Sequence, residues 1–204
     1  VTNPKTILII GAGIAGLAID TLFKEAGFNV VVAESNEKAA QGASSNLAGI
    51  CTPLITQPGV ALGDMHMSSF LLSRQFYKQF GGDFVDFCGC DEYLVNDKML
   101  SKFNHDSKFF SISDDIYPKA NIDLAMQIQP QNLCLALAKN LEIYYGYEYK
   151  SLKQLQSCYE VNFSNLKTIK ADLVIFANGN RAKELFASEF SDAYMQLSSV
   201  RGQT

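Results

Sequence analysis

A glycine-rich turn between two apolar segments constrains this chain more than any other feature. Residues 7–10 read Ile-Leu-Ile-Ile, and residues 11–16 continue as Gly-Ala-Gly-Ile-Ala-Gly into a helical stretch. A second apolar segment follows and ends at Glu34, close to the spacing of about 20 residues typical of dinucleotide-binding folds. The order of strand, glycine turn, helix, strand and acidic residue therefore predicts a dinucleotide-binding βαβ unit in an α/β protein.

The three glycines of this turn each have a physical role. Gly11 permits the tight turn from strand to helix, and Gly13 lets the backbone approach a pyrophosphate. Gly16 lets the helix pack close to the sheet. The alternative is a glycine-rich turn in an unrelated α/β protein, which would not require the flanking elements at these spacings.

The same unit offers partners for the rest of a nucleotide. The backbone N–H groups of Ile14 and Ala15 are expected to be free in the first helical turn, where the helix dipole favours a phosphate. Glu34 would accept hydrogen bonds from ribose hydroxyls and repel a 2′-phosphate, which disfavours NADP. Asp20 is unusual, because helices of this kind usually carry Ala or Gly where it would face the sheet.

Composition fits a globular protein with a real core. The chain has 204 residues, 48% of them hydrophobic and 19% charged, and its net charge is −4. No basic tract marks a nucleic-acid surface, although other parts of a longer protein could provide one.

The cysteines and the apolar segments indicate a compartment. Five cysteines, mostly in apolar settings, suggest free thiols in a reducing cytosol, so the chain is expected to be cytoplasmic. No segment has the roughly 20 apolar residues that span a membrane, and residues 7–19 lack the basic leader and cleavage site of a signal peptide. The cysteines are Cys51, Cys88, Cys90, Cys134 and Cys158.

Periodicity and turn residues predict the order of the elements. A Gly-, Ser- and Pro-rich loop is expected at 41–60, strand character at 83–95, a turn at 178–180 and no clear pattern at 97–120. The predicted helices are 14–26, with Gly27 as C-cap, 65–80 and 131–140, with Pro130 at its start. The predicted strands are 6–10, 29–33, 142–150, 159–163, 167–171 and 172–177.

Three further segments resemble the D-amino-acid oxidase family of flavoproteins, which includes glycine and sarcosine oxidases. They are the loop 42–50, the strand 147–149 before a hairpin, and the strand that ends at residues 177–179. The resemblance implies FAD rather than NAD: the loop would touch the pyrophosphate and flavin, and strand 147–149 the adenine. The expected cofactor-binding residues are Gly11, Gly13, Ile14, Ala15, Gly16, Glu34, Ser44, Ser45, Asn46, Ala48, Gly49, Tyr149, Ala177, Asn178 and Gly179.

A narrower resemblance covers nearly the whole chain. Segments 42–54, 86–89, 143–147, 177–180 and 200–203 are similar, in order, to the FAD-dependent oxidoreductase domain of bifunctional enzymes that make 5-methylaminomethyl-2-thiouridine in tRNA. This resemblance implies removal of the carboxymethyl group from carboxymethylaminomethyl-uridine at the wobble position, by C–N oxidation, imine hydrolysis and glyoxylate release. It also implies a tRNA substrate, an upstream methyltransferase domain and no membrane partner.

Domains of this family are considerably longer than this chain, so we expect a fragment truncated at its C-terminus. The expected fold is a Rossmann-like FAD-binding domain, formed by 1–54 and 131–204, with part of an antiparallel substrate-side domain at 55–130. The substrate-binding arginine and the last flavin contacts would lie beyond Thr204, so no catalytic residue is assigned. Two alternatives stay open: a free-standing glycine, sarcosine or D-amino-acid oxidase, and a non-catalytic nucleotide-binding fragment.

Other ligand-binding side chains have plainer explanations. Cys88 and Cys90 could form a metal pair, but a strand merely places them on one face and no second Cys or His cluster accompanies them, so no metal is predicted. Lone histidines are mostly structural, basic residues on helices are mostly solvated or ion-paired, and a tyrosine-rich strand is more often part of a sheet than a base-stacking surface. These residues are His66, His105, Arg74, Arg181, Tyr144, Tyr145, Tyr147 and Tyr149.

Overall fold

A computed structural model describes residues 5–183 and Leu185 of this chain. The chain divides into two compact units, one formed by Val1–Leu47 with Pro130–Thr204 and the other by Ala48–Gln129. Each unit is considered by itself below.

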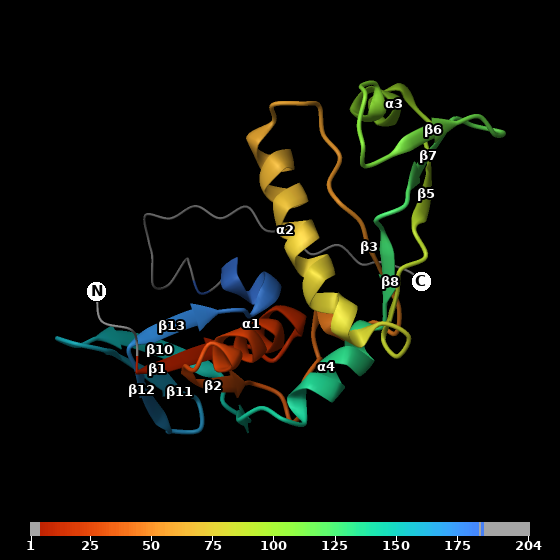
Figure 1. Cartoon of the computed structure of the whole chain (residues 1–204). Helices are drawn as coiled ribbons and strands as arrows, with labels where there is room; N and C mark the ends of the chain where they lie inside the picture. The colour runs from red at the N-terminus through yellow and green to blue at the C-terminus, as the bar shows by residue number, and fades with distance from the viewer. Residues whose placement is uncertain (1–4, 184, 186–204) are drawn as a thin grey trace. The chain divides into compact units, whose positions relative to one another are not determined.

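The first unit is built on a four-stranded parallel sheet with the order β13-β1-β2-β9, of which β13, β1 and β2 are labelled in Figure 1. Parallel sheets are covered on both faces, so their strands read as continuous apolar runs. The two central strands follow this rule, because residues 7–10 and 30–34 are all buried. The strands are β1 (Thr6–Ile10), β2 (Asn29–Glu34), β9 (Ile143–Tyr145) and β13 (Leu173–Phe176).

Two helices and a small antiparallel sheet complete this unit. Helix α1 connects β1 to β2, and Gly27 follows its C-cap with φ of +87°, a conformation that glycine adopts without strain. An apolar cluster that includes Leu8, Val161 and Phe163 joins the parallel sheet to the sheet β10-β11-β12. The elements are α1 (Ile14–Glu25), α4 (Pro130–Ala138), β10 (Tyr149–Gln154), β11 (Tyr159–Phe163), β12 (Thr168–Ala171) and the 3-10 helices η1 (Ala43–Ser45) and η3 (Gly179–Arg181).

The second unit contains two three-stranded antiparallel sheets, β3-β8-β4 and β5-β7-β6, with two helices. One apolar cluster surrounds Phe70, Val85 and Met126, and another includes Leu94 and Phe103. The elements are β3 (Gly49–Cys51), α2 (Ala61–Tyr77), η2 (Lys78–Phe80), β4 (Val85–Asp86), β5 (Cys90–Tyr93), α3 (Asp97–Phe103), β6 (Ser111–Ser113), β7 (Lys119–Ile122) and β8 (Met126–Ile128).

The structure corrects several sequence-based expectations. The single strand predicted at 142–150 is wrong, because Gly146 has φ of +73° and separates β9 from β10, which belong to different sheets. The predicted loop at 41–60 contains η1 and β3, and the unassigned stretch at 97–120 contains α3 and β6. Helix α2 begins at Ala61 rather than near residue 65. Within the described residues, no helix is long and apolar enough to cross a membrane.

Candidate dinucleotide-binding site

Two glycines of the glycine-rich turn, Gly11 and Gly16, are required by the fold itself. A Cβ atom on Gly16 would lie 2.0 Å from the Gly11 carbonyl oxygen, so only glycine lets α1 start this close to β1. Gly11 has φ of +110°, and a Cβ there would lie 2.7 Å from the Ala177 carbonyl oxygen. The absence of both side chains allows the glycine turn, α1 and the end of β13 to meet at one point.

Gly13 is different, because the chain itself leaves space beside it. It is the N-cap of α1, with φ of −85°, and among the described residues other than its chain neighbours, only Ser44 comes within 4 Å of a Cβ built there, with Oγ at 3.3 Å. A small side chain therefore fits at this position only if the Ser44 hydroxyl shifts by a few tenths of an ångström. The space lies at a helix N-terminus, where backbone N–H groups and the helix dipole favour a phosphate.

Glu34 is buried at the end of β2 and already organises the glycine turn. Its Oε2 atom accepts a hydrogen bond of 2.7 Å from the backbone N–H of Ala12. Its Oε1 atom accepts from the backbone N–H of Asn36 at 2.9 Å, from the Asn36 side chain at 2.6 Å and from Ser35 Oγ at 3.2 Å. A carboxylate offers about four acceptor sites shared by two oxygens, so Oε2 keeps capacity for a ribose hydroxyl.

Ser44 connects the loop after β2 to two helices. Its hydroxyl accepts a hydrogen bond of 3.0 Å from the backbone N–H of Ile14, so the expectation that this N–H is free is wrong. The Ser44 hydroxyl also hydrogen-bonds the buried thiol of Cys134 on α4. Burial raises the pKa of Cys134 to about 11, and the Ser44 bond opposes this shift only in part. Cys134 therefore stays a neutral thiol and packs as a small apolar side chain.

The carboxyl end of β13 adds a polar atom to the site. The backbone N–H of Ala177 donates to Ile10 at 2.8 Å, which places Asn178 beside Gly11. Asn178 Oδ1 is buried and has no hydrogen-bond partner among the described residues. A buried acceptor without a partner is costly, and a hydroxyl of a bound nucleotide would supply the missing donor. Gly179 follows with φ of +60° and starts η3.

The other residues predicted to bind the cofactor lie in several different parts of the chain. Ala15 is exposed in the first turn of α1, Ser45 is exposed at the end of η1, and the Asn46 carbonyl accepts from Gln131 at 3.3 Å. Ala48 and Gly49 begin the second unit, where Gly49 pairs with Ile128 in the sheet β3-β8-β4. The Tyr149 ring packs edge-on against Phe176 in the apolar cluster under the parallel sheet.

Sequence reasoning missed two contributors to this site. Asn36 holds Glu34 through two hydrogen bonds, a role that an Asx-type turn directly after the strand could have suggested. Ala40 is buried with φ of +59°, and its N–H donates to the Ala12 carbonyl at 3.0 Å. The sequence does not predict this left-handed backbone conformation, because alanine rarely adopts it. The surrounding contacts hold Ala40 in it.

Asp20 is the least expected residue near the site. It is fully buried on α1, where Lys24 Nζ lies 3.2 Å from its Oδ1, while Oδ2 has no hydrogen-bond partner among the described residues. Burial raises the pKa of Asp20, Lys24 opposes the shift, and the charge of Glu142 adds to it.

The other side chains singled out from the sequence make structural contacts. Arg74 donates to the Leu124 carbonyl at 3.0 Å and lies over the Phe87 ring, while Arg181 pairs with Glu148 at 3.6 Å on the surface. The His105 ring packs against Phe110. In the described part of the chain, no three His, Cys, Asp or Glu residues are grouped to hold a metal ion.

Comparison with known proteins agrees with this geometry. The model of the family described as FAD dependent oxidoreductase (DAO) matches residues 6–204. The chain is 51% identical over 200 residues to the tRNA 5-methylaminomethyl-2-thiouridine biosynthesis bifunctional protein MnmC of Campylobacter fetus subsp. fetus (strain 82-40), covering 97% of this chain and 32% of that protein. It is 40% identical over 210 residues to the protein of the same name from Campylobacter hominis, covering 98% of this chain and 31% of the relative.

A solved structure supports the fold. L-proline dehydrogenase from P. horikoshii matches with a TM-score of 0.71 and 16% identity, over 92% of this chain and 56% of that one. At this identity the likeness supports the fold alone. The chain spans about a third of the length of the curated relatives it matches.

Proposed function

This chain belongs to the family of FAD-dependent oxidoreductases, and we propose that it is the FAD-binding part of an enzyme that modifies the wobble uridine of tRNA. The proposed reaction removes the carboxymethyl group from carboxymethylaminomethyl-uridine and releases glyoxylate. The observation that carries this proposal is the 51% identity to the Campylobacter fetus protein over 97% of the chain.

The residues of the first unit fit FAD. Gly13 leaves space at the N-terminus of α1 for the pyrophosphate, and Glu34 Oε2 has capacity for a ribose hydroxyl. Asn178 Oδ1 supplies a buried acceptor in need of a donor. FAD, when bound, supplies the hydride acceptor for oxidation of the substrate C–N bond. The protein residues described here bind and orient the cofactor.

We assign the two units different parts of this task. The first unit would bind FAD, together with residues up to about 54, and residues 55–130 would form the substrate side. Ser45, Asn46, Ala48, Gly49 and the backbone of Tyr149 remain proposed cofactor contacts. The arginine that would bind the substrate carboxylate is predicted to lie beyond Thr204.

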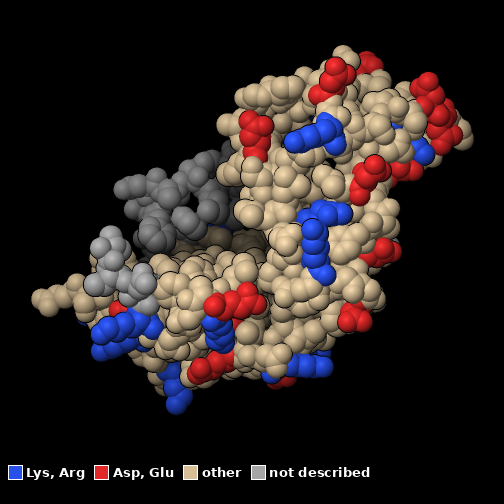
Figure 2. Space-filling view, viewed as in Figure 1, with Lys and Arg blue, Asp and Glu red and all other residues tan. Residues whose placement is uncertain are grey.

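The tRNA itself would be bound largely outside this chain. The net charge is −4, and acidic and basic side chains are interspersed on the face shown in Figure 2, which does not resemble the continuous basic surface of a nucleic-acid-binding protein. The relatives are named bifunctional and are about three times as long, which supports a further domain in the same polypeptide. We propose, from the family resemblance, that this domain is an upstream methyltransferase. Such an enzyme would act in the cytoplasm, where its tRNA substrate is found.

The test uses the complete polypeptide encoded by the gene that contains this chain. The purified protein is incubated with tRNA carrying carboxymethylaminomethyl-uridine, and nucleosides and glyoxylate are measured by mass spectrometry. We expect equimolar aminomethyl-uridine and glyoxylate, and no glyoxylate from free glycine or sarcosine. Oxidation of glycine or sarcosine, with tRNA unchanged, would instead support the amino-acid oxidase alternative. A protein that purifies without FAD and cannot be loaded with it would support the non-catalytic alternative.

A further inference from the structure

Cys88 and Cys90 form a pair of thiols that the proposed function does not use. They flank Gly89 at the start of β5, in the second unit. Both are free cysteines; Cys88 is exposed, and Cys90 is half-buried against the apolar cluster around Leu94. The described residues offer no third ligand that would make them a metal site.

The backbone between the two cysteines is bent. Gly89 has φ of +75°, and its N–H donates to the Ala125 carbonyl at 3.1 Å. A disulfide needs a Cα separation of about 4.4–6.8 Å. Two residues of fully extended chain span at most about 7 Å, so a bend at Gly89 brings Cys88 and Cys90 within that range.

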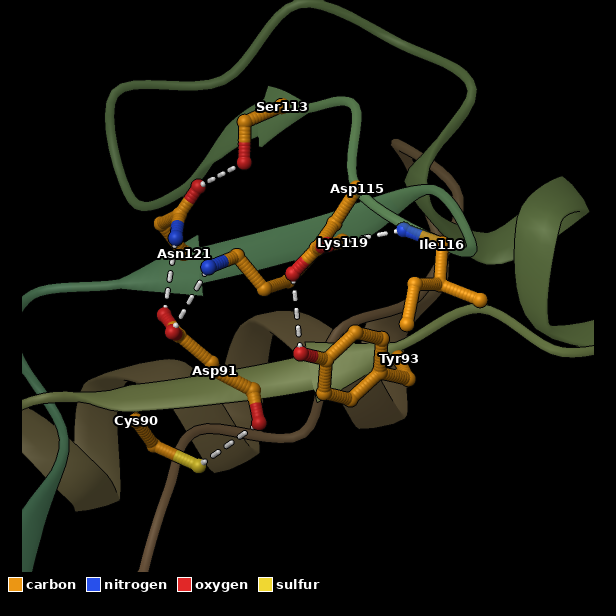
Figure 3. Close-up of polar contacts among 8 residues, drawn as sticks. All are labelled: Cys90, Asp91, Tyr93, Ser113, Asp115, Ile116, Lys119 and Asn121. Carbon is orange, nitrogen blue, oxygen red and sulfur yellow. Dashed lines mark hydrogen bonds and ion pairs between the residues drawn. The ribbon is translucent and has the colours of Figure 1, made fainter.

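Neither sulfur is held by a strong contact. Cys88 Sγ lies 3.4 Å from the Gly89 carbonyl oxygen. Cys90 Sγ lies 3.7 Å from the Asp91 carbonyl oxygen, as Figure 3 shows. Thiols are weak donors, so these two contacts cost little to break when the side chains rotate about their Cα–Cβ bonds to bring the sulfur atoms together.

The surroundings give the two thiols different reactivities. Burial raises the pKa of Cys90, and the negative charges of Glu92, Asp91 and an ionised Cys88 raise it further. The thiolate is the reactive form of cysteine, so the exposed Cys88 should react first with an oxidant. Cys90 is then the neighbouring thiol that can complete the reaction.

We propose that Cys88 and Cys90 are a redox modification site at which hydrogen peroxide produces a reversible intramolecular disulfide. The Cys88 thiolate attacks one peroxide oxygen, the O–O bond breaks, and a sulfenic acid and hydroxide form. The Cys90 sulfur then loses its proton and attacks Cys88 Sγ, so that the S–S bond forms and the S–O bond breaks with release of water. Two thiols lose two electrons in total, and the peroxide becomes two water molecules. A dithiol reductant reverses the change, and none of these steps depends on FAD or tRNA.

The experiment is mass spectrometry of the full chain after brief exposure to hydrogen peroxide. Remaining thiols are blocked with N-ethylmaleimide in denaturant, and the chain is digested with trypsin. Residues 79–98 contain no internal Lys or Arg and hold both cysteines, so one fragment reports on the pair. We expect this fragment to be unalkylated and about 2 Da lighter than its dithiol form, and to regain two maleimide groups after dithiothreitol treatment.

Two variants make the result specific. Cys90→Ser should abolish the 2 Da loss and leave a sulfenic acid on Cys88 that dimedone traps. Cys158→Ser changes another half-buried cysteine and should leave the 2 Da loss in place. The proposal is overturned if fragment 79–98 keeps both alkylated thiols after exposure. It is also overturned if Cys88 becomes oxidised while Cys90 remains alkylated.

Discussion

Gly16→Ala tests whether the close start of α1 is as tight as the structure indicates. The new Cβ would lie 2.0 Å from the Gly11 carbonyl oxygen and 3.3 Å from Ile9 Cγ2, and a backbone atom cannot move aside as a side chain can. Overpacking of this kind costs about 1–3 kcal/mol, and the 2.0 Å contact places this case near the upper end. The better helix propensity of alanine returns about 1 kcal/mol. The net loss in the free energy of unfolding should therefore be about 2 kcal/mol.

The assay is thermal unfolding of the chain without cofactor, followed by circular dichroism. A loss of about 2 kcal/mol corresponds to a Tm lower by about 4–8 °C for a protein of this size. Gly42→Ala is the matched control, because Gly42 has φ of −100° and no described residue other than its chain neighbours lies within 4 Å of a Cβ built there. It should change Tm by less than about 2 °C. Equal Tm values for the two variants would refute the reasoning about the close approach at Gly16.

Three further predictions concern the cofactor site and pH. Gly13→Val should abolish FAD binding because its side chain fills the pyrophosphate space; unchanged flavin content after purification of the complete polypeptide would contradict this. Glu34→Ala should weaken FAD binding by about 1.5–3 kcal/mol and also lower the apo Tm, because the Ala12 N–H loses its partner; an unchanged dissociation constant would remove Glu34 from the site. Asp20 has a raised pKa, so its ionisation penalises the folded state as pH rises through that pKa. Asp20→Ala should therefore stabilise the chain at pH 8 and much less at pH 4, which urea unfolding at both values can measure.

The opening βαβ unit could be predicted from the sequence because its signals are local. The three glycines follow one another closely, between residues 11 and 16, and the apolar runs of β1 and β2 have the continuous pattern of a buried parallel strand. The predicted strand at 6–10 has the observed bounds, and the predicted strand at 29–33 ends one residue before β2 does. Identification of FAD required the resemblance to a family, because proteins that bind different dinucleotides share the same glycine motif.

Other parts could not be predicted, because they depend on contacts between distant residues. Ser44 lies 30 positions after Ile14, and no local pattern shows that its hydroxyl would accept the Ile14 N–H. The error at 142–150 has a similar cause: the tyrosine pattern continues through Gly146, and only the pairing partners reveal two strands. In the second unit the strands have two to four residues, which is too short for a clear alternation of apolar and polar residues.

The hydrogen bonds of the glycine turn separate two kinds of residue in the site. The N–H groups of Ala12 and Ile14 already donate to Glu34 and Ser44, so these two side chains shape the site before a nucleotide arrives. Variants of either one should change the stability of the apo chain as well as affinity, because the buried Ala12 N–H or the half-buried Ile14 N–H loses its partner. Gly13 alone among these positions borders space that the chain leaves open, apart from the 3.3 Å approach to Ser44 Oγ. A side chain at Gly13 should therefore lower affinity for FAD, and its effect on apo stability measures how far the Ser44 hydroxyl, held by the Ile14 N–H, can shift away from the new Cβ.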